Sequence, residues 1–178
     1  MEQFYASVTT CCFLLMGLWW SVMQFRHIEW SQDVHARRMS YDVYLSFLLP
    51  GIMSMAAQIG GDLALLWRMV FAVVGVMGLM TALWSIPRVM THYPNLNFLK
   101  YGRWLMVLLY VALIFVAVAP NLALLIKPLK PIQLEGMLVS LILFVGVNVA
   151  WEFMSQPKDE YAQPAPRSEG VPDMPITG

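Results

Sequence analysis

Residues 63–86 read LALLWRMVFAVVGVMGLMTALWSI, an apolar run with one charged residue, Arg68. A hydrocarbon core about 30 Å thick is crossed by about 20 helical residues at a rise of 1.5 Å per residue. The run is therefore long enough to span a membrane as a helix. One of its faces collects small residues, which predicts close packing against a neighbouring helix. These are Ala72, Gly75 and Ala82, with Gly78 nearby.

Four further apolar stretches have the length of a membrane span. They lie at about 6–25, 41–60, 101–119 and 132–154, with residue 126 as an alternative end of the fourth span. Hydrophobic residues make up 59% of the 178 residues and charged residues only 12%, whereas soluble domains carry roughly 25% charged residues. The predicted fold class is an all-α membrane protein, a five-helix transmembrane bundle in which residues 1–154 form one domain.

The segment 155–178 has a different composition. It holds five prolines and several charges without apolar periodicity. Such a segment buries too little surface to offset the entropy cost of ordering it. We predict a disordered tail.

Positive charge falls mainly on one side of these spans. Lys127 and Lys130 fall on the other side, and Arg68 lies inside a span. The eight residues that share a side are Arg26, Arg37, Arg38, Arg88, Lys100, Arg103, Lys158 and Arg167. Because short connections rich in Lys and Arg stay in the cytoplasm, we predict an N-terminus outside and a C-terminus in the cytoplasm. We therefore predict a multi-pass protein of a prokaryotic plasma membrane.

Several residues are expected to shape the ends of the spans. Pro50 should bend the second span, because proline removes a backbone hydrogen bond. Asp62 should cap the third span after a tight glycine turn, and Pro87 should end that span. Pro131 suits the first position of the fifth helix.

A short surface helix is predicted to lead into the second span. Asp33 is a suitable N-cap residue. Asp33 and Arg37, and likewise Arg38 and Asp42, have the i, i+4 spacing of helical charge pairs.

Polar residues inside spans are the candidate functional residues, since a charge at mid-helix costs roughly 2.5 to 3.5 kcal/mol. They are Ser54, Gln58, Arg68, Asn148 and Glu152. Arg68 either extends to the outer headgroups or faces the bundle, where Gln58, Asp62 or an anion could bind it. Ser54 and Gln58 share a face that serves either helix packing or a solute path.

The fifth span carries two of these candidates. Glu152 is either solvated at the cytoplasmic interface, an ion site with Asn148, or a partner of Arg26 or Arg103. Glu135, at the other end of the same span, is expected to complement the positive helix N-terminus.

No catalytic, cofactor or metal residues are predicted. His27, Glu29, Asp33 and His35 cluster in one connection, but their spacing matches no strong zinc pattern. The histidines lie in or beside connections, where they cannot form an intramembrane haem ligand pair. The net charge of zero gives no reason to expect nucleic acid.

The leading hypothesis is therefore a non-enzymatic membrane component. It would contact the lipid bilayer and act through helix packing with itself or with other membrane proteins. The alternative is a small oligomeric channel or transporter for ions or small solutes, in which an oligomer builds the path.

Overall fold

The computed structural model describes residues 2–60, 63–92, 97–119 and 131–155. This part of the chain is helical and contains no strand. Its elements are α1 (Glu2–Phe25), α2 (His27–Gln32), α3 (Val34–Gly60), α4 (Ala64–His92), α5 (Asn97–Val118) and α7 (Pro131–Met154). All but the short α2 are long and apolar enough to cross a membrane, which gives the five predicted span candidates.

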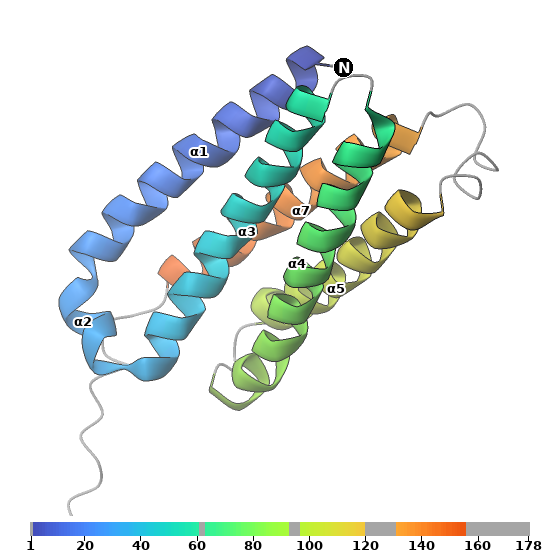
Figure 1. The fold of residues 1–178 in the computed structure, drawn as a ribbon. Coiled ribbons are helices and arrows are strands. Elements are labelled where there is room, and N and C mark those ends of the chain that lie inside the picture. Colours follow the sequence, from blue (N-terminus) through green and yellow to red (C-terminus); the bar gives the residue numbers. More distant parts are fainter. Residues whose placement is uncertain (1, 61–62, 93–96, 120–130, 156–178) are drawn as a thin grey trace, which may run out of the picture.

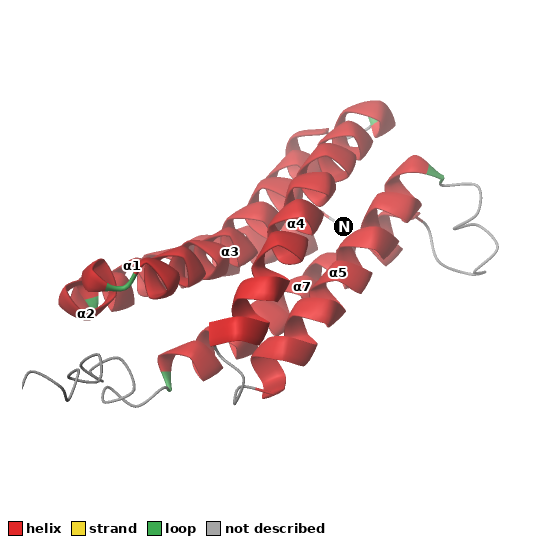
Figure 2. Cartoon of the chain, turned by 90° about the horizontal axis from the view of Figure 1, so that it is seen from below, coloured by secondary structure: helices red, strands yellow, loops and turns green. Residues whose placement is uncertain are grey.

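Four of the long helices form a closed ring. α3 packs against α4 and α7, and α5 packs against the same two helices. α1 lies outside this ring, mainly along α3, as Figures 1 and 2 show. The interior of the ring is therefore bounded by α3, α4, α5 and α7.

The small-residue face predicted for residues 63–86 packs on α5. A Cβ atom added to Gly78 would lie 2.3 Å from the ring of Tyr110, and one added to Gly75 would lie 2.9 Å from Ile114. Atoms cannot approach so closely, so these two glycines permit the contact between α4 and α5. The close-packing interpretation is confirmed at these positions.

One end of the bundle collects the basic residues and is called the basic end below. Contacts at this end join the helix termini: Arg26 Nη2 donates to the carbonyl of Met154 at 2.9 Å, and the rings of His35 and His92 stack at 3.6 Å. The described basic residues here are Arg26, Arg37, Arg38, Arg88, Lys100 and Arg103. Lys158 and Arg167 lie outside the described residues.

Asp33 is the N-cap of α3, as predicted. Its Oδ1 accepts a hydrogen bond from the backbone N–H of His35 at 2.8 Å. The expected surface helix and the second span form one continuous helix, which runs on through Pro50 to Gly60. The cap at Asp33 stabilises the start of this helix. Pro50 does not end the helix, and its buried position among the other helices is consistent with tertiary packing that offsets the lost hydrogen bond.

Two predicted helix ends were wrong. α4 continues through Pro87 to His92, and α5 begins at Asn97 rather than near residue 101. Proline removes one helical hydrogen bond, but the buried residues Ile86 and Val89 hold this last part of α4 against the bundle. α7 begins at Pro131, as predicted.

Three expectations fall outside the described residues. They are the cap at Asp62, the alternative end of the fourth span at residue 126, and the tail beyond Ser155.

Candidate functional site

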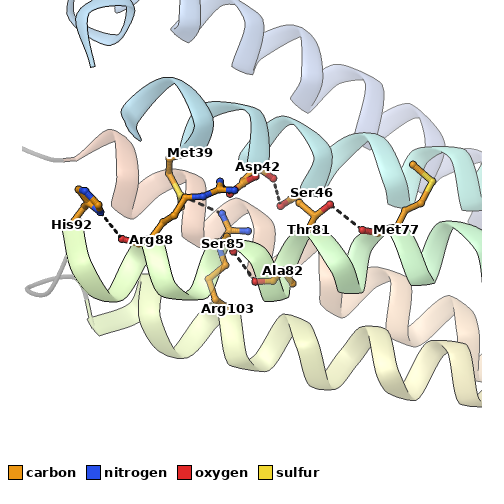
Figure 3. Close-up of polar contacts among 10 residues, drawn as sticks. All are labelled: Met39, Asp42, Ser46, Met77, Thr81, Ala82, Ser85, Arg88, His92 and Arg103. Carbon is orange, nitrogen blue, oxygen red and sulfur yellow. Dashed lines mark hydrogen bonds and ion pairs between the residues drawn. The ribbon is translucent and has the colours of Figure 1, made fainter. Parts of the chain in front are cut away.

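Three charged side chains from three helices meet inside the ring near its basic end. Asp42 comes from α3, Arg88 from α4 and Arg103 from α5 (Figure 3). Arg88 Nη1 lies 3.7 Å from Asp42 Oδ2. Asp42 is 8% exposed and Arg103 only 1%. We call these three residues the charge cluster.

Helical spacing explains why Arg103 is buried. Leu99, Arg103, Met106 and Tyr110 follow one another at intervals of four, three and four, so they lie on one face of α5. All four are buried. The charge pattern groups Arg103 with the basic residues of the connections, but α5 starts early enough to place its side chain inside the ring.

Asp42 also differs from its predicted environment. Its expected partner one turn away, Arg38, is exposed, whereas Asp42 turns inward and pairs with Arg88 of α4. The ion pair thus joins two helices of the ring instead of stabilising one helix locally.

The guanidinium of Arg103 has few acceptors around it. Its Nη2 donates to the sulfur of Met39 at 3.5 Å, and its Nε has no hydrogen-bond partner among the described residues. The hydroxyl of the nearby Ser46 donates its hydrogen to the carbonyl of Asp42 at 2.9 Å. The oxygen of Ser46 therefore remains free to accept a hydrogen bond. A guanidinium offers five N–H donors. Arg103 is therefore under-satisfied in this site.

The cluster also carries unequal charge. Two guanidinium groups face one carboxylate, and the effective cost of burying an ion is several kcal/mol after relaxation. A recess beside the cluster, lined by Asp42, Thr81, Arg103 and Tyr110 among others, has room for roughly one water molecule. The arrangement can therefore hold a water, a proton or a very small ion.

A second buried carboxylate lies at the opposite end of the bundle. Glu135 is 0% exposed, and neither of its oxygens has a hydrogen-bond partner among the described residues. Arg68 is the cation that acts on it electrostatically. The guanidinium of Arg68 also lies over the ring of Trp67, at 5.4 Å from its centre. Arg68 is half-buried there, with its Nε unpartnered in the described structure.

Ser54 and Gln58 lie in the half of α3 that is far from the basic end. Gln58 Nε2 donates to Thr9 Oγ1 of α1 at 2.7 Å and to the carbonyl of Ser54 at 3.2 Å. Ser54 is fully buried, and its hydroxyl has no partner among the described residues. Gln58 thus makes a polar contact across the interface between α1 and α3.

Asn148 and Glu152 lie in the part of α7 that reaches the basic end. Asn148 donates to the carbonyl of Phe144 in its own helix at 2.8 Å. Glu152 Oε1 accepts a hydrogen bond at 3.2 Å from the backbone N–H of Phe98, in the first turn of α5. The candidate residues therefore do not form one site: Ser54 and Gln58 are neighbours on α3, Asn148 and Glu152 are neighbours on α7, and Arg68 lies on α4. Their functional role stays a prediction.

Two of the three histidines, His35 and His92, form a pair that the sequence does not predict. His35 at the start of α3 and His92 at the end of α4 stack because α4 extends past Pro87. Within the described part of the chain, no group of three or more His, Cys, Asp or Glu side chains is placed to hold a metal ion.

The charge cluster was also missed, although the sequence contains a signal for it. The spacing of Arg103 with Leu99, Met106 and Tyr110 places it on an apolar face that runs into the span. A scan against protein-family models and searches of curated proteins and solved structures find no match for this chain.

Proposed function

We propose that this chain is a multi-pass plasma-membrane protein that acts without catalysis, by packing against a second copy of itself or other membrane proteins. Its five apolar helices support a membrane location. The basic residues at one end support a cytoplasmic basic end, with the N-terminus outside.

The observation that carries this proposal is the incomplete burial of α1. Of the 18 consecutive residues that make up its apolar segment, only 22% are buried, compared with 56% of the corresponding segment of α3. Together with α3 and α7, α1 borders an apolar groove with a volume of about 290 Å³. The groove is lined by Leu15, Leu18, Trp19, Val22, Phe47, Val147, Ala150, Trp151 and Met154.

A second copy of the chain is the expected first occupant of this groove. Helices associate in lipid through van der Waals packing, which a concave apolar surface favours. The exposed residues Phe13, Leu14 and Leu18 belong to α1 itself. Because α1 supplies both a ridge and one wall of the groove, two copies can meet through the same patch, as a twofold dimer requires.

Oligomeric state in lipid nanodiscs tests the proposal. We expect a dimer by native mass spectrometry, and we expect Leu18→Trp in the groove to weaken association by about tenfold, or about 1.4 kcal/mol. Leu108→Trp is the matched control, since Leu108 is 64% exposed on α5 and Leu18 is 65% exposed on α1. A monomer at every protein density, with no co-purifying membrane protein, would contradict the proposal.

The charge cluster favours one alternative, a small oligomeric channel or transporter. Ionisable residues inside a membrane often mark ion pathways. Proteoliposomes should then pass protons, monovalent cations or anions, and Asp42→Asn or Arg103→Gln should reduce this flux. Flux that responds to these variants would replace the packing function, whereas no flux above empty liposomes would remove the alternative.

A further inference from the structure

The corner formed by α1, α2 and α3 at the basic end contains a second recess, separate from the charge cluster. Its volume is about 190 Å³, smaller than the roughly 300 to 1,000 Å³ of sites that enclose a whole drug-sized ligand. It is lined by Met23, His27, Trp30, Ser31, Arg37, Ser40 and Tyr41.

Two lining residues carry buried polar groups without partners. Trp30 is 4% exposed and Ser40 is 1% exposed. The indole Nε1 of Trp30 and the hydroxyl of Ser40 have no hydrogen-bond partner among the described residues. Leaving such a donor unpaired costs roughly 1 to 3 kcal/mol. Both residues line the recess, so an acceptor oxygen of a bound ligand that comes within hydrogen-bond distance would satisfy either group.

Packing holds these two groups in place. The Trp30 ring lies 5.1 Å from the ring of Phe153 and 5.9 Å from that of Trp19, measured between centroids. Trp19 Nε1 in turn donates to the carbonyl of Ser40 at 3.1 Å. The recess therefore has a rigid wall formed by residues from α1, α2, α3 and α7.

The charge of the lining indicates the sign of the ligand. Arg37 is exposed, His27 lies at the same recess, and none of the lining residues that the structure describes is a carboxylate. The nearby Asp33 turns its Oδ1 to the backbone N–H of His35. A cation beside two unpaired donors suits a phosphate group, which arginine binds through charge-assisted hydrogen bonds.

The apolar lining and the location indicate an amphipathic ligand. Met23 and Tyr41 border the recess, and Tyr41 is 57% exposed. Aromatic rings of this kind favour the headgroup level of a membrane. We propose that this recess binds the phosphate headgroup of an anionic phospholipid, with the acyl chains lying outside against the apolar helix surface.

The test uses the full-length protein in detergent with added phosphatidylglycerol, phosphatidylcholine or inorganic phosphate. We expect phosphatidylglycerol to be retained in native mass spectrometry and to raise the melting temperature more than phosphatidylcholine does. Arg37→Gln should weaken phosphatidylglycerol binding by about tenfold, because it removes a charge-assisted contact. The control is Arg38→Gln, since Arg38 is the exposed neighbour and does not line the recess.

Two further variants examine the buried donors. Trp30→Phe keeps an aromatic ring but removes the N–H, and Ser40→Ala removes the hydroxyl. Both should weaken phosphatidylglycerol binding by a few fold while the unliganded melting temperature is retained. Equal binding of the two lipids, or equal effects of Arg37→Gln and Arg38→Gln, would overturn the proposal. Binding of inorganic phosphate with the same sensitivity to these variants would assign a soluble ligand instead.

Discussion

Arg103 shows how one residue can be misplaced by a charge-based prediction. A basic residue near the end of an apolar run is expected at the interface, where its side chain reaches water. In the bundle, Arg103 instead shares an inner face with Leu99 and Met106, and it is 1% exposed. Sequence position along a span therefore predicts depth, whereas the face that a residue occupies depends on neighbouring helices.

The excess positive charge of the cluster predicts unequal effects of two neutralising substitutions. Asp42→Asn leaves the buried Arg103 and the partly buried Arg88 without a carboxylate and should destabilise the protein by about 3 to 5 kcal/mol. Arg103→Met leaves the Asp42–Arg88 pair balanced, so stability should be unchanged or higher by about 1 to 4 kcal/mol. Denaturant unfolding in micelles measures both. The opposite order would show that Arg103 is compensated by a group other than Asp42.

Gly78 offers a second prediction at the scale of a residue. A Cβ atom there would overlap the ring of Tyr110, at 2.3 Å, so Gly78→Ala should cost about 1 to 3 kcal/mol. Gly17 is the matched control, because a Cβ atom at this helical position meets nothing within 4 Å. Gly17→Ala should be neutral or stabilising by about 0.5 to 1 kcal/mol. Equal melting temperatures for the two variants would contradict the packing of α4 on α5.

At the scale of elements, the sequence predicts the helices better than their ends. Hydropathy identifies each span candidate because a polar group without a hydrogen-bond partner costs free energy in the hydrocarbon region of a bilayer. The ends depend on tertiary contacts, which explains why α4 passes Pro87 and why α5 starts at Asn97. Asp33 and Pro131 were predictable because capping and first-turn preferences are local.

The contact of Glu152 with the first turn of α5 gives a prediction for this element. Glu152→Ala removes the acceptor for the N–H of Phe98, so the start of α5 should fray at a cost of about 1 kcal/mol. Glu152→Gln keeps an acceptor oxygen and should retain most of the protection. Hydrogen exchange at residues 98–101 measures the difference. Unchanged exchange in Glu152→Ala would show that this contact contributes little.

At the scale of the whole molecule, the sequence predicts the five helices that are long and apolar enough to span a membrane, and it predicts that most basic residues gather at one end. It does not predict the ring, because lipid and protein interior are equally apolar and hydropathy alone cannot mark the inward face. For the same reason, the sequence does not predict that Asp42, Arg88 and Arg103 lie close together. These residues belong to three different helices.

The orientation of the molecule remains a prediction that can be measured directly. Reporters fused after residue 155 should be active only when they function in the cytoplasm, and reporters placed before α1 only when they function outside. Substituting the exposed residues Arg37 and Arg38 with Gln together should lower the fraction of molecules in this orientation. A C-terminal reporter that is active only outside the cell would reverse the predicted topology.

The position of α7 in the ring has a consequence for biosynthesis. Among the helices that the structure describes, α7 is synthesised last, and it closes the ring by packing against both α3 and α5. The carbonyl of Met154 that accepts the hydrogen bond from Arg26 belongs to its final residue. Until synthesis reaches this point, the inner faces of α3 and α5 lack their cover, and Arg103 lies in an open bundle. We therefore expect the chain to be most sensitive to proteases after α5 and before α7 has been synthesised.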